Sequence, residues 1–236
     1  MIRFENVYVR YDSGQSALNQ VVLHIGKGEF VYIVGKTGAG KSTFIKLIYR
    51  EIKAEFSKIP GKQQRNGYVL VDGEDVAQIK SKDVPYYRRK LGVVFQDFRL
   101  LEKKTVFENV AFALEVIDTP RKVIRQRVTE VLALVGLSDK ANAYPNQLSG
   151  GEKQRVAIAR AIVNKPKVVI ADEPTGNLDP KTSDEIVRLL LKVNEEEKTT
   201  VIMVTHDTAL VKKYPKRTIS MDHGCIKHDG DFVEED

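Results

Sequence analysis

The segment from Gly35 to Ser42 carries more structural information than any other stretch of this chain. It follows the apolar run Phe30–Val34, fits the pattern G-x-x-x-x-G-K-[ST], and reads Gly35-Lys36-Thr37-Gly38-Ala39-Gly40-Lys41-Ser42. Glycines permit the backbone angles that turn successive N–H groups toward one anion, and the helix expected from Ser42 to about Tyr49 adds its positive dipole end. The segment therefore predicts a buried strand, a phosphate-binding loop and a helix, as in an α/β fold.

A triphosphate is the natural ligand of such a loop, and we expect ATP with Mg²⁺. Lys41 is expected to neutralise the β and γ phosphates, and the Ser42 hydroxyl to ligate the magnesium ion. Thr43 is counted with the loop residues that bind the nucleotide. The alternative is a glycine-rich turn without a ligand, which the strand before the loop and the helix after it disfavour.

A second apolar run, Val168–Ala171, ends in the carboxylates of Asp172 and Glu173. It reads as a buried parallel strand with an exposed polar end. Ligands of open α/β sheets lie beyond the carboxyl ends of the strands, so Asp172 is expected to hold the magnesium shell opposite Ser42. Glu173 is expected to be the general base that polarises the attacking water. The alternative is an ordinary surface Asp-Glu turn.

Two further positions follow this strand. His206 ends the buried strand predicted at Thr200–Thr205, where its imidazole would reach the γ-phosphate; a purely structural histidine is the alternative. Asp179 precedes Pro180 and fits a helix N-cap, a role compatible with a place near the nucleotide. The stretch Thr182–Asn194 then predicts an amphipathic helix whose apolar stripe packs the core.

The segment Leu148–Glu152 lies between the phosphate loop and the acidic strand. Its residues Ser149, Gly150 and Gly151 precede a helix predicted from Glu152 to about Asn164. The positive end of that helix dipole favours an anion near Ser149.

Together these motifs resemble the ATP-binding subunits of ABC transporters along essentially the whole chain. The residues that carry the resemblance are Tyr11, Gly35–Ser42, Gln96, Leu148–Glu152, Asp172, Glu173, Asp179 and His206. The resemblance implies that Tyr11 stacks on adenine, and that Gln96 contacts magnesium and moves with a membrane partner. It also implies that two copies pair head to tail on ATP binding, with Ser149–Glu152 of one copy contacting the ATP held by the other. A monomer is then expected to hydrolyse ATP poorly.

The implied fold is α/β: a P-loop NTPase core with a parallel sheet, an N-terminal antiparallel β subdomain and an inserted α-helical signature lobe. We expect one nucleotide-binding domain over residues 1–236, with the core at 1–96 and 166–236 and the helical lobe at 97–165.

Local patterns support this division. Alternating residues at Ile2–Val9 and Ala17–Ile25 predict antiparallel strands, and Glu55–Asn66 reads as a surface loop before a strand at Tyr68–Val71. An apolar face that ends at Gly136 predicts a helix of the lobe; its residues are Val128, Val131, Leu132 and Val135.

Composition limits the remaining classes. No apolar run approaches the eighteen or so residues of a membrane span, and the N-terminus lacks a secretory apolar core, so we expect a cytoplasmic protein, peripheral on the inner face of the membrane. The single cysteine, Cys225, excludes an intrachain disulfide. The net charge of +6 comes from dispersed basic residues, so no specific nucleic acid is expected.

Within the family, Phe95–Leu101 and Lys103–Phe112 look most like the cell-division branch. That branch implies ATP hydrolysis coupled to a conformational change in an integral membrane partner that controls peptidoglycan hydrolysis. Two alternatives stay open. Motors of lipoprotein release and macrolide export share the pattern from Glu173 to Asp179, and the basic charge allows a soluble ATPase that acts on nucleic acid or ribosomes. Lys153 departs from the family, in which glutamine is frequent at this position.

Overall fold

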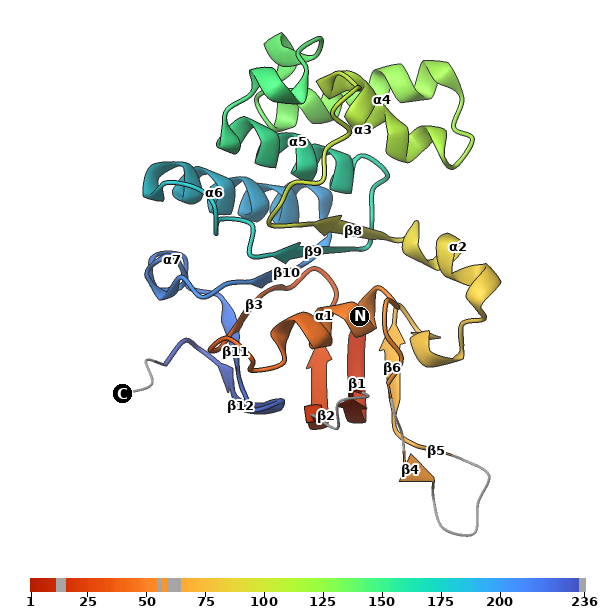
Figure 1. The fold of residues 1–236 in the computed structure, drawn as a ribbon, viewed down its shortest axis with the longest axis vertical. Coiled ribbons are helices and arrows are strands. Elements are labelled where there is room, and N and C mark those ends of the chain that lie inside the picture. The colour runs from red at the N-terminus through yellow and green to blue at the C-terminus, as the bar shows by residue number, and fades with distance from the viewer. Residues whose placement is uncertain (12–15, 55–56, 59–64, 234–236) are drawn as a thin grey trace. The chain divides into compact units, whose positions relative to one another are not determined.

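The computed structural model describes residues 1–11, 16–54, 57–58 and 65–233 of the chain (Figure 1). The chain forms two compact units, Met1–Arg88 with Ile202–Asp236, and Arg89–Val201. Among the described residues, no helix has both the length and the apolar character needed to cross a membrane.

The first unit contains an antiparallel sheet in the order β2-β1-β6-β7. Its strands are β1 (Ile2–Arg10), β2 (Ser16–Ile25), β6 (Tyr68–Val71) and β7 (Glu74–Asp75). Alternate β1 residues, including Ile2 and Phe4, are fully buried, and they pair with Ile25 and Leu23 of β2. The buried side chains therefore lie on one face of the sheet, as the alternating pattern predicts.

The same unit holds strands in the order β12-β11-β3-β10. They are β3 (Phe30–Val34), β10 (Thr200–Val204, in this unit from Ile202), β11 (Arg217–Asp222) and β12 (Cys225–Gly230). Strands β3 and β11 are parallel, and every residue of β3 is buried. The phosphate loop thus begins at the carboxyl end of a buried parallel strand, as expected.

The first unit also contains the helices α1 (Lys41–Ile48), α2 (Val84–Arg88) and α7 (Thr208–Lys213), and the 3-10 helices η1 (Val76–Gln78) and η2 (Ser81–Asp83). Helix α1 buries Phe44, whose ring stacks on Phe4 of β1 with centroids 4.4 Å apart. This contact joins the antiparallel sheet to the helix that follows the phosphate loop.

The predicted surface loop Glu55–Asn66 is described only in part, because residues 55–56 and 59–64 lie outside the described residues. The described parts form two short antiparallel strands, β4 (Ser57–Lys58) and β5 (Arg65–Asn66). These four positions therefore belong to a β ladder, which the sequence did not predict.

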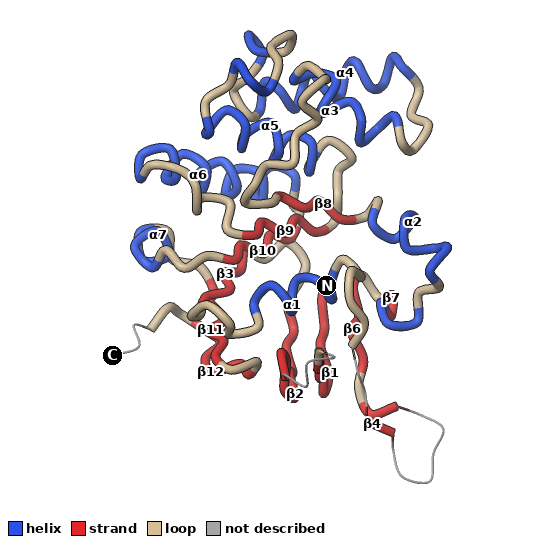
Figure 2. Tube along the Cα trace, viewed as in Figure 1, coloured by secondary structure: helices blue, strands red, loops and turns tan. Residues whose placement is uncertain are grey.

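The second unit contains the parallel pair β8 (Leu91–Val94) and β9 (Val168–Asp172). Its helices are α3 (Val106–Glu115), α4 (Arg121–Leu134), α5 (Gly150–Ile162) and α6 (Pro180–Glu197), with the 3-10 helices η3 (Ser138–Lys140) and η4 (Pro145–Gln147). Helix α5 packs on β8, α3, α4 and α6, so it is the central helix of this unit (Figure 2).

Local signals explain where these helices begin and end. Thr105 and Glu108 form a capping box at the start of α3. Helix α4 ends at Leu134, two positions before Gly136, whose φ is +72°. The stripe predicted on α4 is buried, and so is the stripe on α6, which consists of Ile186, Leu189, Leu190 and Val193.

The predicted fold class is confirmed: the chain is α/β, with parallel strands, an N-terminal antiparallel sheet and an inserted helical segment that carries α3, α4 and α5. The division into compact units does not test the expected bounds at 96/97 and 165/166, which stay a prediction.

Candidate functional site

The predicted site residues fall on both units. Tyr11, residues 35–43 and His206 belong to the first, whereas Gln96, Ser149–Glu152, Asp172, Glu173 and Asp179 belong to the second.

The phosphate loop has a backbone that only glycine accepts at two positions. Gly35 has φ +148°, and a Cβ added there would lie 2.2 Å from the carbonyl oxygen of Met221. Gly40, the N-cap of α1, has φ +102°, and its Cβ would lie 2.5 Å from the carbonyl oxygen of Ala17. Because both neighbours are backbone atoms, a larger residue at either position would displace a strand or loop.

Lys41 is already held at this loop. Its Nζ donates to the carbonyl oxygens of Gly35, at 2.6 Å, and Lys36, at 3.2 Å. The ammonium group therefore lies beside a loop of left-handed glycines at the N-terminus of α1. This combination of a fixed cation, glycine backbone N–H groups and a helix dipole fits a polyphosphate.

Tyr11 contacts the first turns of α1. Its hydroxyl and the Thr43 hydroxyl lie 2.8 Å apart, and the tyrosine is 41% exposed. The contact keeps an accessible aromatic ring close to the phosphate loop. Its stacking on adenine stays a prediction.

His206 lies in the same pocket as the phosphate loop. This cavity of about 500 Å³ is lined by Val34, Gly35, Lys36, His206, Thr208, Ser220, Met221, Asp222, His223, Phe232 and Val233. Within the first unit, the structure thus brings His206 next to the start of the loop. Its contact with a γ-phosphate stays a prediction.

Glu173 has an unusual backbone. Its φ is +48°, in the left-handed region, although the next residue is Pro174. A non-glycine residue in this region costs about 1–3 kcal/mol and persists only where its surroundings enforce it. The preceding residue, Asp172, ends β9, so both carboxylates lie at the carboxyl end of a parallel strand.

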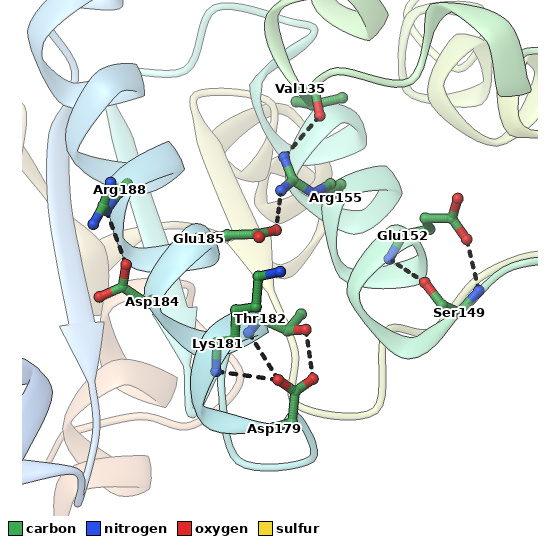
Figure 3. Close-up of polar contacts among 10 residues, drawn as sticks. All are labelled: Val135, Ser149, Glu152, Arg155, Asp179, Lys181, Thr182, Asp184, Glu185 and Arg188. Atoms are coloured by element: carbon green, nitrogen blue, oxygen red, sulfur yellow. Dashed lines mark hydrogen bonds and ion pairs between the residues drawn. The ribbon is translucent and has the colours of Figure 1, made fainter.

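Ser149 is the N-cap of α5 (Figure 3). Its hydroxyl accepts from the Glu152 backbone N–H at 3.3 Å, and the Glu152 carboxylate accepts from the Ser149 N–H at 2.8 Å. The Ser149 N–H bond, aided by Lys140, lowers the pKa of Glu152. The helix begins at Gly150, earlier than predicted, because this capping box sets its start. The S-x-x-E pattern is the signal that could have found it.

The glycines after Ser149 lie against the start of α6. A Cβ at Gly151 would lie 2.4 Å from the methyl carbon of Thr182, and one at Gly150 would lie 3.2 Å from Leu178. Asp179 caps α6, as predicted, by accepting from the N–H groups of Lys181 and Thr182 (Figure 3). The Thr182 hydroxyl also donates to Asp179 and lowers its pKa.

Gln96 is joined to the loop that leads from Glu173 to Asp179. The amide of Asn177 donates to the Gln96 carbonyl at 3.2 Å, and Gln96 Nε2 lies 3.5 Å from Asn177 Oδ1. Within the second unit, therefore, Gln96, Glu173, Asp179 and the Ser149 segment belong to one connected set of loops and helix starts.

Known proteins match most of this chain. Residues 18–176 match the ABC transporter family. The chain is 56% identical over 229 residues to the cell division ATP-binding protein FtsE of Bacillus subtilis (strain 168), covering 97% of this chain and 96% of that protein. The chain belongs to the ABC transporter ATPase family.

The chain is also similar to an ATP-binding protein of an import system and to a solved cassette structure. The methionine import ATP-binding protein MetN of Pasteurella multocida (strain Pm70) is 42% identical over 237 residues, 99% of this chain and 66% of that protein. The dimeric structure of MJ0796, a bacterial ABC transporter cassette, superposes with a TM-score of 0.83 at 37% identity and covers 100% of both chains.

Arg160 of α5 makes a long-range contact that the sequence did not indicate. Phe98 and Arg99, which follow Gln96 closely, have φ of +58° and +50°. The Arg160 guanidinium of α5 donates to both of their carbonyl oxygens, at 2.9 Å and 2.6 Å. Burial lowers the pKa of Arg160, and its planar fork matches the two acceptors of this turn. Nothing in the local pattern signals this long-range contact.

Replacing Arg160 with methionine is expected to lower the free energy of unfolding by about 2–3 kcal/mol, because two carbonyls of a strained turn lose charged donors. Urea titration followed by circular dichroism measures the change. Arg160→Lys should lose less, since lysine can still donate to one carbonyl. An unchanged stability in Arg160→Met would show that the turn does not need this contact.

Proposed function

We propose that this cassette is the ATP-binding and ATP-hydrolysing subunit of an FtsEX-like complex in cell division. In this proposal it drives an integral membrane partner resembling FtsX, which controls peptidoglycan hydrolysis. The observation that carries the proposal is the identity of 46–56% to curated FtsE proteins over 97% of the chain. The expected location is the inner face of the cell membrane, where the chain would be held by that partner.

In the proposed reaction, ATP binds to the loop Gly35–Thr43, with Lys41 on its β and γ phosphates and the Tyr11 ring on adenine. The fixed ammonium and left-handed glycines support this assignment. Glu173 acts as the general base toward the attacking water, and His206 contacts the γ-phosphate.

The Mg²⁺ site is proposed from the donor chemistry. A hydroxyl from Ser42, an amide oxygen from Gln96 and a carboxylate from Asp172 are the hard oxygen donors that Mg²⁺ prefers. The ion would neutralise phosphate charge when bound. Gln96 also lies in the segment Phe95–Leu101, where the membrane partner is proposed to dock.

The active form is proposed to be a homodimer on ATP. The dimeric MJ0796 structure, 37% identical over all of the chain, supports this arrangement. Ser149, Gly150, Gly151 and Glu152 would then contact the ATP held by the second copy. The capping box supports a defined position of Ser149 at the positive end of α5, and Asp179 would lie at the same interface.

A second candidate function is the ATPase motor of an exporter or lipoprotein-release system, because these share the Glu173–Asp179 pattern. The MetN relatives add solute import as an outcome to be tested, at 42% identity. A soluble ATPase acting on nucleic acid is supported only by the net charge of +6.

Affinity purification of the Glu173→Gln chain from its own cells, trapped with ATP and Mg²⁺, tests the proposal. Mass spectrometry is expected to identify an FtsX-like membrane protein, and the same purification without ATP and Mg²⁺ is the control. Recovery of a permease with a solute-binding protein would instead favour transport. The proposal also fails if cells with only Glu173→Gln at normal abundance separate normally.

A further inference from the structure

Gln154 is a fully buried polar residue in the second turn of α5. Its Nε2 donates to the carbonyl oxygen of Pro174 at 2.8 Å. Its Oε1 is buried and has no hydrogen-bond partner among the described residues. The orientation of the amide is set by Pro174, because a carbonyl oxygen can only accept. The Nε2 end of the side chain is therefore hydrogen-bonded and the Oε1 end is not.

This arrangement is poor for stability alone. Leaving a buried polar atom without a partner costs more free energy than a typical intramolecular hydrogen bond contributes. An apolar side chain of similar shape would remove the unpaired oxygen at the loss of a single bond. Such groups in folded proteins call for another explanation, and a role in catalysis is one of them.

The bond acts on the backbone that directly follows Glu173. Glu173 has φ +48°, its carbonyl oxygen accepts from the Gly176 N–H at 3.1 Å, and Thr175 is buried. The residue before a proline is already restricted, so a left-handed Glu173 needs support from its surroundings. Gln154 supplies a side-chain contact from a neighbouring helix to this turn.

We infer that Gln154 is a positioning residue for ATP hydrolysis: it holds the Glu173–Pro174 backbone so that the Glu173 carboxylate is presented to the attacking water. The inference rests on the proposed function, in which Glu173 is the general base. Because Gln154 and the N-cap Ser149 belong to the same helix, this bond also links the start of α5 to the turn that carries Glu173.

The test is Gln154→Met, which keeps the approximate shape and removes both polar ends of the side chain. The ATPase is assayed in complex with its membrane partner at saturating ATP. We expect kcat to fall about 10- to 100-fold, the size of effect that small misplacements of catalytic groups produce. The KM for ATP and the thermal midpoint should stay close to those of the native chain, or the midpoint should rise, because the unpaired oxygen is gone.

Asn194→Leu is the matched control. Asn194 is also buried on a helix and donates its amide to a backbone carbonyl, that of Thr199, at 2.7 Å. That bond lies at the C-terminal end of α6, so this variant should lose stability and keep kcat. Gln154→Leu serves as a second variant if the methionine protein does not fold.

The outcomes separate this inference from the proposed function. A lower kcat at unchanged stability in Gln154→Met supports it. An unchanged kcat, or a kcat that falls only in proportion to lost folded protein, overturns it while Glu173→Gln remains inactive. If Glu173→Gln hydrolyses ATP at the native rate, then the general-base assignment itself is wrong and the inference fails with it.

Discussion

Replacing Glu173 with glutamine is expected to lower kcat for ATP hydrolysis by about 10²- to 10⁴-fold, the range that general bases contribute. Glutamine has the same shape but cannot take a proton from water. The strained backbone at Glu173, with φ +48°, is set by its surroundings and should survive the substitution. ATP affinity should stay within about threefold, because the phosphate loop is untouched. Phosphate release at saturating ATP and equilibrium ATP binding measure the two quantities.

Glu195→Gln is the control for this prediction. Glu195 is exposed near the C-terminal end of α6. Its replacement also changes a carboxylate to an amide. Its kcat should equal that of the native chain. Turnover in Glu173→Gln above a tenth of the native rate would contradict the general-base role and point to another group as the proton acceptor.

The second large effect is expected at Lys41. Replacing it with methionine keeps most of the unbranched side chain and removes its charge. Each hydrogen bond to a charged group contributes about 1.5–3 kcal/mol, so the Kd for ATP should rise at least about 10- to 100-fold. The Gly35 and Lys36 carbonyls hold the ammonium at 2.6 Å and 3.2 Å, which fixes its position at the phosphate loop. Titration calorimetry measures the affinity.

Lys46→Met in the same helix is the matched control. Lys46 is partly exposed and forms an ion pair with Glu51 at 3.2 Å, so its loss should leave ATP affinity unchanged. Equal loss of affinity in both variants would indicate a general effect of net charge. An unchanged Kd in Lys41→Met would mean that this loop does not bind the phosphates.

Several elements could be predicted from the sequence because their causes are local. The apolar runs at Phe30–Val34, Val168–Asp172 and Thr200–Val204 are strands at the expected positions. Asp179 caps α6 and Gly136 follows the end of α4, since caps and stops depend on neighbouring backbone groups. The start of α5 was misplaced because the capping box of Ser149 and Glu152 was not used.

The motifs could also be recognised from the sequence, because a phosphate loop and an acidic strand end require particular residues at fixed spacing. Their spacing along the chain identified the family, and the match over residues 18–176 confirms it. The role of each site residue stays a prediction.

Contacts between distant parts of the chain hold these motifs in place, and the sequence did not indicate them. Tyr11 meets Thr43, Gln96 meets Asn177 and Arg160 meets Arg99, contacts that join residues 32, 81 and 61 positions apart. Gln154 reaches Pro174, 20 positions away, in the same way, beside the left-handed Glu173. A sequence pattern reports periodicity and caps within one element. It carries no signal for which buried amide or guanidinium faces a distant carbonyl, because that depends on how the whole chain packs.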